Sequence, residues 1–256
     1  MKLICPVCGK PLEKIAKEAV CGNGHHFDYA KSGYLNLLLS NKKIHGDDAA
    51  MVKARTAFLE SGAYGFLRNR LAELAGESEV LCDLGCGEGY YTSAFAAREK
   101  YGFDLSKDAL KHAAKKDKQT AYTIASIFHL PLPDACADTV ITCFAPLAKE
   151  EILRILKPGG RFIFVTPGKR HLFEMKEVLY EHPYENEEAK PDTGMRLIHR
   201  EEIENTFICS KEQLADLFMM TPYVWRTSRK DQERLKEKEQ LSLTAEFVIH
   251  VFEKDT

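Results

Sequence analysis

Short apolar runs alternate with segments of helical periodicity along most of the chain. Five runs have the length and composition of buried strands, namely residues 80–82, 101–103, 121–125, 138–144 and 161–166. Helical patterns stand between them at residues 94–97, 106–118 and 150–156. This alternation predicts an α/β fold built on a doubly wound parallel sheet.

Further elements are predicted on both sides of this α/β core. Before the first strand, residues 49–60 and 64–74 are predicted helices, the first of them capped by Asp47 or Asp48. After the fifth strand, residues 181–204 are acidic and interrupted by proline, so we expect a loop or lid there. The remaining predictions are a strand at 205–209, a helix at 210–218, a basic helix at 228–238 and a strand at 245–252.

The segment EVLCDLGCGEGYY, residues 79–91, joins the end of the first strand to a glycine-rich turn. The strand ends at Asp83, and the glycines that follow are Gly85, Gly87 and Gly89. Glycines let the backbone turn sharply and let a ligand approach main-chain N–H groups. The second strand ends in Asp104, where a carboxylate is placed to accept both ribose hydroxyls of an adenosine. These features predict a site for an adenosine-containing cofactor.

This arrangement looks like motifs I and II of the class I S-adenosylmethionine-dependent methyltransferases. A dinucleotide-binding G-x-G-x-x-G pattern needs glycine at position 90, where this chain has Tyr90. The other alternative is that the glycines serve packing alone, which the paired carboxylates of Asp83 and Asp104 disfavour. The pattern therefore favours a methyltransferase over a dehydrogenase.

Cysteine spacing near the N-terminus predicts a metal site. Cys5 and Cys8 form a C-x-x-C turn, and Cys21 follows with His25 and His26 close behind it. Three thiolates and one imidazole are a suitable tetrahedral ligand set for Zn²⁺. A segment of about forty residues has too small a core to fold alone, so a bound metal ion would stabilise it. The spacing does not choose between the two histidines. A redox-active C-x-x-C pair is the alternative, but that motif normally lies in a βαβ unit.

The composition limits the function classes. A chain of 256 residues with a net charge of −2 fits one large domain, or a medium domain with an appendage, and shows no global basic field. Residues 1–43 are locally basic, however, with seven lysines against three acidic residues. No apolar stretch approaches the roughly 20 residues of a membrane span, and no apolar signal core begins the sequence. We therefore expect a cytoplasmic protein whose eight cysteines are metal ligands and buried thiols.

Longer stretches of the chain resemble the RlmA family of bacterial 23S rRNA guanine-N1 methyltransferases. The similarity extends over nearly the whole chain, and the pieces that carry it are CPVC, CGNGHHFDYAKSGYLNLL, GDDAAMVKARTAFLESGAYGFLRNRL, DLGCGEGYYT, KPGGRFIFVTPGKRHLFEMK and MMTPYVWR. We expect a zinc-binding domain at 1–40, a helical connector at 41–76 and a class I (Rossmann-like) methyltransferase domain at 77–256. The resemblance implies S-adenosyl-L-methionine and Zn²⁺ as cofactors, a hairpin-loop guanine of 23S rRNA as substrate, and a homodimer.

The resemblance also implies roles for individual residues. The H-x-F-D part of the family's ligand pattern selects His25, and the loop after the third strand is where class I enzymes contact adenine. The expected zinc ligands are Cys5, Cys8, Cys21 and His25, and the expected cofactor-binding residues are Tyr64, Asp83, Gly85, Gly87, Glu88, Gly89, Asp104, Ser126 and His171.

The catalytic chemistry is less clearly marked. Many amino-group methyltransferases end the fourth strand in an Asn/Asp-Pro-Pro-Tyr motif, whereas this chain has Cys143, Phe144, Ala145 and Pro146 there. This departure argues against methylation of an exocyclic amine by that scheme. Phe144 either stacks on the target base or belongs to the core, and the sequence identifies no catalytic base.

Two other functions remain open at this point. One is a small-molecule methyltransferase with a structural zinc, and the other is a non-catalytic zinc-ribbon RNA-binding module that retains a cofactor fold. Lys31, Lys42 and Lys43 lie near aromatic residues and are candidates for contacts with RNA phosphates. The alternative is that those aromatics only pack the small ribbon.

Overall fold

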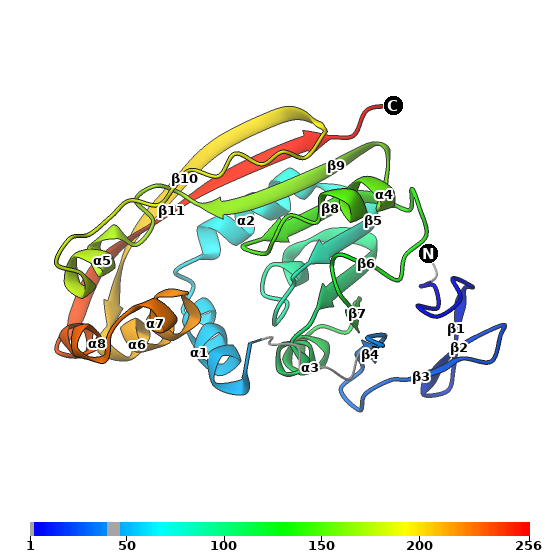
Figure 1. Ribbon diagram of the computed structural model, residues 1–256, viewed down its shortest axis with the longest axis horizontal. Helices are drawn as coiled ribbons and strands as arrows, with labels where there is room; N and C mark the ends of the chain where they lie inside the picture. The colour runs from blue at the N-terminus through cyan, green and yellow to red at the C-terminus, as the bar shows by residue number, and fades with distance from the viewer. Residues whose placement is uncertain (1–2, 40–46) are drawn as a thin grey trace.

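A single mixed sheet forms the centre of the molecule. The computed structural model describes residues 3–39 and 47–256 (Figure 1). The strand order is β10-β11-β9-β8-β5-β6-β7-β4. In chain order the strands are β4 (Leu35–Asn36), β5 (Glu77–Leu84), β6 (Ala96–Asp104), β7 (Thr120–Ile124), β8 (Ala137–Cys143), β9 (Leu156–Pro167), β10 (Arg196–Ser210) and β11 (Gln240–Glu253). Neighbours from β4 to β9 pair in parallel, whereas β11 runs antiparallel to β9 and β10.

The strand order reverses at β5, which has β6 and β7 on one side and β8 and β9 on the other. In open α/β sheets, ligands bind beyond the carboxyl ends of the strands at such a switch point. Helix α3 (Lys107–Lys116) leads from β6 towards β7, and α4 (Lys149–Ile155) leads from β8 to β9. The predicted α/β class is therefore confirmed, and the glycine loop leaves the sheet at the switch point.

Helices and the N-terminal segment cover both faces of the sheet. Leu81 of β5 belongs to one core, together with residues of α1 (Ala49–Glu60) and α2 (Gly65–Ala75). Val80 and Cys82 belong to the other core, which α4 and the N-terminal segment complete. Neighbouring residues of a strand face opposite sides, so both sides of β5 are buried, as its apolar sequence predicts.

The N-terminal segment forms a small antiparallel sheet of β1 (Leu12–Ile15), β2 (Glu18–Cys21) and β3 (His26–Asp28). Strand β4 then pairs in parallel with β7, and Leu37 N donates a 3.0 Å hydrogen bond to Ile124 O. Ile4 N also donates to Pro131 O at 2.9 Å. The ribbon is thus joined to the edge of the large sheet, a connection that the sequence pattern does not predict.

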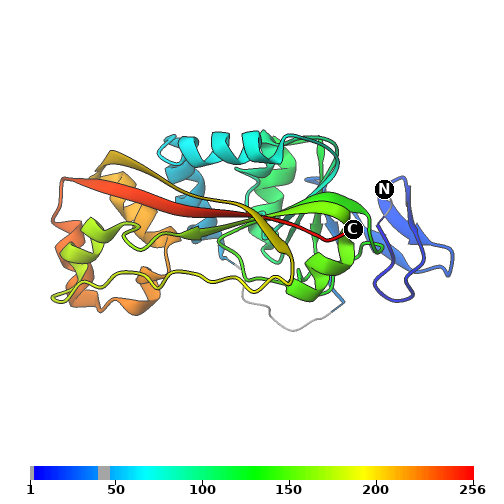
Figure 2. The ribbon, with the colours of Figure 1, turned by 90° about the horizontal axis from the view of Figure 1, so that it is seen from above.

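The C-terminal half extends the molecule in the opposite direction. Strands β10 and β11 pair from Arg196–Glu253 to Ser210–Gln240 with one register shift. Four helices gather at the end of the molecule remote from the ribbon (Figures 1 and 2): α5 (Phe173–Leu179), α6 (Lys211–Met220), α7 (Tyr223–Arg226) and α8 (Arg229–Lys236). Within residues 3–39 and 47–256, no helix has both the length and the apolarity to cross a membrane.

Helix starts follow the side chains expected to cap them. Of the two candidates for α1, Asp48 is the cap, and its carboxylate accepts a 2.9 Å hydrogen bond from Met51 N. Ser106 and Ser210 cap α3 and α6, the latter in a reciprocal capping box with Gln213. Local hydrogen bonding of this kind is visible in sequence because it involves residues three positions apart.

The connection from β5 to β6 contains no α-helix, so the helix predicted at residues 94–97 is wrong. Thr92–Ala94 form one turn of 3₁₀-helix, and Ala97 lies within β6. Helices α1 and α2, which precede β5, pack on this face of the sheet instead. Arg68 of α2 donates to Tyr90 O at 2.7 Å and so joins α2 directly to the short connection.

Residues 196–204 belong to β10, so the predicted loop or lid is confined to residues 181–195. Strand β10 is an edge strand with few fully buried side chains, so apolar alternation is weak in its sequence. The loop itself is bound to the β9–α5 connection, because Asn186 N donates to Lys169 O at 2.8 Å. The buried Lys176 ammonium also donates to Tyr184 O at 2.8 Å.

Candidate functional site

The N-terminal ribbon brings four metal-binding side chains together. The ligand atoms of Cys5, Cys8, Cys21 and His25 all lie within 4.8 Å of one another. Cys8 Sγ is 3.7 Å from Cys21 Sγ, and His25 Nδ1 is 3.3 Å from Cys21 Sγ. A tetrahedral zinc with Zn–S bonds of about 2.3 Å separates two thiolates by roughly 3.8 Å. The Cys₃His donor set therefore fits a structural zinc.

Two tight turns present these ligands. Gly9 N donates to Cys5 O at 2.8 Å, and Gly24 N donates to Cys21 O at 2.9 Å. Both glycines have left-handed backbones, with φ of +70° and +78°. Glycine adopts this conformation without steric cost, which explains why one glycine directly follows Cys8 and the other directly precedes His25.

The two neighbouring histidines have different surroundings. His26 is exposed, and its Nδ1 lies 2.8 Å from a carboxylate oxygen of Glu18 on the adjacent strand. His25 instead faces the thiols of Cys5 and Cys21. The geometry favours His25 as the fourth ligand, in agreement with the choice that the family resemblance implies.

The glycine loop after β5 has a backbone that only glycine accommodates. Gly85, Gly87 and Gly89 have φ values of +77°, +53° and +78°. A Cβ at Gly85 would lie 2.5 Å from Ala145 Cβ, and a Cβ at Gly89 would lie 2.4 Å from Tyr122 Oη. Side chains at these positions would thus collide with neighbours as well as strain the backbone. Gly85 and Gly87 are partly exposed whereas Gly89 is buried, so a cofactor is able to approach the main chain at the first two glycines.

Asp104, at the end of β6, fixes the glycine loop. Its Oδ2 accepts a 2.8 Å hydrogen bond from Gly87 N, and its Oδ1 accepts a 2.7 Å bond from Ser106 N. Burial raises the pKa of this carboxyl, although both hydrogen bonds act in the opposite direction. Each carboxylate oxygen keeps a second acceptor site, so the group is able to receive ribose hydroxyls while holding the loop.

Asp83 is almost wholly buried beneath the loop. Thr92 Oγ1 donates a 2.6 Å hydrogen bond to its Oδ2. Burial raises the pKa of Asp83 to about 7, and the negative charges of Asp104 and Glu88 add to the shift. A nearby cation would lower the pKa of Asp83 again. The sulfonium and ammonium groups of S-adenosylmethionine are cations of this kind.

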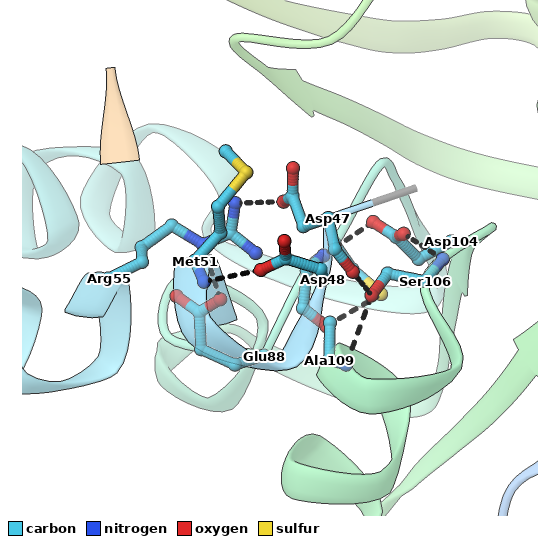
Figure 3. A network of polar contacts seen from close by, with 10 residues as sticks. Asp47, Asp48, Met51, Arg55, Glu88, Asp104, Ser106 and Ala109 are labelled. Atoms are coloured by element: carbon cyan, nitrogen blue, oxygen red, sulfur yellow. Dashed lines mark hydrogen bonds and ion pairs between the residues drawn. The ribbon is translucent and has the colours of Figure 1, made fainter. Parts of the chain in front are cut away.

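Helix α1 contributes a charged network that closes over the loop (Figure 3). Arg55 Nε donates to Glu88 Oε2 at 2.6 Å, and Arg55 Nη1 pairs with the Asp47 carboxylate. Ser106 Oγ donates to Asp47 O at 2.8 Å, so the start of α3 joins the same network. Asp47, Arg55 and Glu88, here called the Arg55 network, connect α1 to the cofactor loop.

Sequence reasoning missed Arg55 and Asp47 as site residues. The available signal was periodicity, because Arg55 lies three residues after Val52 and four before Leu59, both buried in α1. A charged residue on the buried stripe of a helix requires a charged partner elsewhere in the fold. That partner is Glu88, 33 positions away, which local patterns do not reveal.

Tyr64 and His171 meet in the interior, 107 positions apart in the chain. The Tyr64 hydroxyl is 3.5 Å from His171 Nε2, and Glu246 N donates to His171 Nδ1 at 3.3 Å. Burial lowers the pKa of His171 to about 3, so the ring is neutral at pH 7. Because Nδ1 accepts a hydrogen bond, the ring proton is assigned to Nε2, which faces Tyr64.

A series of aromatic rings connects the glycine loop to His171. Tyr91 contacts Phe144 with ring centroids 6.3 Å apart, Phe144 lies 5.3 Å from Phe247, and Phe247 lies 4.8 Å from His171. Phe144 is 44% exposed and has a left-handed backbone with φ of +60° at the end of β8. Its exposure distinguishes it from the residues of the buried cores.

The expected cofactor residues fall into three groups in the structure. Asp83, the three loop glycines, Glu88 and Asp104 surround the switch point, and Tyr64 and His171 pair at the far end of the aromatic series. Ser126 lies beyond β7 on the β6–β7 side, where its Oγ accepts a 3.3 Å hydrogen bond from Phe128 N. No described contact joins Ser126 to the loop.

Comparison with known proteins agrees with this architecture. The family model described as RlmA, N-terminal, matches residues 3–44, and a methyltransferase-domain model matches residues 76–238. YcgJ of Bacillus subtilis has a similar fold, with a TM-score of 0.52 at 13% identity over 75% of this chain and 99% of that one. The fold, the glycine loop and these matches define a class I S-adenosylmethionine-dependent methyltransferase with an N-terminal zinc ribbon, and its cofactors are S-adenosyl-L-methionine and Zn²⁺.

The relatives identify the family. The chain is 38% identical to the 23S rRNA (guanine(748)-N(1))-methyltransferase of Streptomyces fradiae, over 69% of this chain and 67% of that one. It is 28% identical to a candidate 23S rRNA (guanine-N(1)-)-methyltransferase of Bacillus subtilis (strain 168), over 96% of this chain and 94% of that one. The chain belongs to the RlmA family.

Proposed function

We propose that the protein transfers the methyl group of S-adenosyl-L-methionine to N1 of a guanine in a hairpin loop of 23S rRNA. The observation that carries the proposal is a Cys₃His ribbon joined through β4 to the edge of the sheet that carries the cofactor loop, in a chain of the RlmA family. The names of the relatives support rRNA and guanine N1 as the target. The hairpin loop is the part of the proposal that only the family resemblance implies. It agrees with the chemistry, because N1 lies on the Watson–Crick edge and must be unpaired to react.

Binding and orientation are the main contributions of the protein to this reaction. The bound cofactor supplies a methyl group activated by its sulfonium. Asp104 is proposed to hold the ribose, and the partly exposed backbone at Gly85 and Gly87 is proposed to lie along the methionine portion. Holding the methyl group in line with the nucleophile accounts for much of the acceleration in such transfers.

The aromatic residues beside the loop are proposed to receive the target base. Phe144 is half-exposed between Tyr91 and Phe247, so a flipped guanine has an aromatic face to stack on. The neutral His171 adds no charge to this apolar wall at pH 7. The same rings limit water near the reacting atoms.

The assembly and location follow from the same proposal. We propose a homodimer, as the family resemblance implies, with the ribbon of each protomer holding the RNA hairpin. The lysine excess of residues 1–43 supports a role in phosphate contact, and Lys31 is exposed on the ribbon. We place the protein in the cytoplasm, where ribosomal RNA is its substrate.

Reverse transcription of 23S rRNA tests the proposal. Methylation at guanine N1 blocks Watson–Crick pairing, so reverse transcriptase stops at the modified base. The stop should be present in the wild-type strain, absent after deletion of the gene, and restored by the wild-type gene but not by an Asp104→Ala variant. An unchanged stop pattern after deletion would refute the rRNA assignment, and methyl transfer to small-molecule extracts would support the competing methyltransferase function.

A further inference from the structure

We infer that Arg55 binds the carboxylate of the cofactor's methionine portion through its Nη2 group. The inference rests on the cofactor site of the proposed function and adds a residue that the sequence pattern does not assign. It depends on the geometry of the Arg55 network and on the charges around the glycine loop.

The guanidinium of Arg55 uses two of its three nitrogens within the protein. Nε donates to Glu88 at 2.6 Å, and Nη1 pairs with Asp47. Nη2 is buried and has no hydrogen-bond partner within residues 3–39 and 47–256. A buried guanidinium donor without an acceptor is unfavourable, so an acceptor from a ligand is expected at this position.

The Nη2 group of Arg55 lies against the cofactor loop. Its Nη2 is 3.3 Å from the position that a Cβ would occupy at Gly87. Asp104 binds the N–H of the same glycine from the ribose side. Arg55 and Asp104 therefore approach one point of the loop from different elements, α1 and β6 (Figure 3).

The local charges favour a carboxylate at Nη2. Asp83, Glu88 and Asp104 are all buried or nearly so around the loop, and Asp47 adds a fourth carboxylate. These groups suit the sulfonium and ammonium of S-adenosylmethionine but repel its carboxylate. Arg55 is the cation that the network places against the loop. Burial acts to lower the pKa of its guanidinium, but the carboxylates of Glu88 and Asp47 raise it by more, so the group stays charged.

A second arginine nearby serves as a matched control. Arg68 of α2 also lies beside the loop, but its Nε donates to Tyr90 O at 2.7 Å and its Nη2 to Ser93 Oγ at 3.2 Å. Two of its nitrogens thus have acceptors in the protein, and among the described residues Arg68 has no buried donor left without a partner. Arg68→Met removes the same charge near the same loop without removing a donor at Gly87.

Decarboxylated S-adenosylmethionine is the discriminating probe, because it lacks only the carboxylate. Calorimetry should show that the wild type prefers S-adenosylmethionine by at least about tenfold, the value of one charge-assisted hydrogen bond. Arg55→Met should abolish the preference by weakening S-adenosylmethionine alone, and Arg68→Met should retain it. Arg55→Lys keeps a positive charge beside Glu88 and Asp47, and it should reduce the preference for S-adenosylmethionine several-fold. This variant provides the test if Arg55→Met does not fold.

The outcomes separate this inference from the function on which it rests. Equal weakening of both ligands by Arg55→Met would show that the network only supports the loop and would overturn the inference. An unchanged preference in the Arg55 variants would overturn it as well, while leaving the methyltransferase proposal intact. Failure of the wild type to bind S-adenosylmethionine would overturn both.

Discussion

Replacing Asp104 by alanine tests the centre of the cofactor site. This carboxylate accepts hydrogen bonds from Gly87 N at 2.8 Å and Ser106 N at 2.7 Å, so it has a structural role even without a ligand. In the proposed complex it also receives the ribose hydroxyls. Asp104→Ala is therefore expected to reduce both the stability of the protein and its affinity for the cofactor.

The two effects have different sizes. Each hydrogen bond to a charged group contributes about 1.5–3 kcal/mol, but burial raises the pKa of Asp104 and offsets part of this. We expect the free energy of unfolding to fall by about 2–3 kcal/mol. Loss of the ribose contacts should weaken cofactor binding at least about tenfold, beyond any effect of a looser loop.

Calorimetric titration with S-adenosylmethionine measures the affinity, and urea denaturation of the ligand-free protein measures the stability. Asp108→Ala is the control, because Asp108 is an exposed carboxylate in the first turn of α3. It should change neither quantity appreciably. Unchanged affinity in Asp104→Ala, with or without a loss of stability, would refute the ribose contact.

Three further predictions follow from the ionisation, metal and charge patterns. Burial raises the pKa of Asp83 from 3.8 to about 7, so the folded protein binds this proton more tightly than the unfolded chain. The free energy of unfolding should therefore fall as the pH rises from about 4 to 7, and denaturation curves of Asp83→Asn should lack this decline. Cys21→Ser should abolish zinc binding and loosen the ribbon, while the core around Leu81 persists; full zinc occupancy by metal analysis would contradict this. Neutralising Lys31, Lys42 and Lys43, the last two outside the described residues, should weaken RNA binding and lower its salt dependence by about one unit per lost contact. Identical salt slopes for this variant and the wild type would rule out the ribbon as the phosphate clamp.

Elements specified by local sequence were predictable. The apolar runs of β5 to β9 identify the sheet, because strands buried on both faces have continuous apolar sequences. Asp48, Ser106 and Ser210 mark helix starts through bonds to residues three positions away. The glycine loop and Asp104 were likewise visible, since the strand-end spacing and the need for positive φ are encoded locally.

Features that depend on distant neighbours were not predictable. Residues 94–97 fit a helical period, but whether that stretch becomes helical depends on α1 and α2, which already cover the face. The segment 196–204 is charged, and only its pairing with β11 makes it a strand. Arg55 belongs to the site through its contact with Glu88, and Asp47 through its contact with Ser106. A local sequence pattern specifies neither contact, because the partners are far apart in the chain.

The pairing of β4 with β7 has a consequence for the order of folding during synthesis. Cys5 to His25 are close in sequence, so the ribbon is able to close around its metal as soon as it leaves the ribosome. The strand on which it docks is β7, where Thr123 pairs with Leu35, and β7 emerges only much later. A ribbon that closes at this stage has no sheet edge to pair with until α1, β5, β6 and β7 have been made. Early metal capture keeps its cysteines ligated and its exposed edge ordered until the catalytic sheet is available.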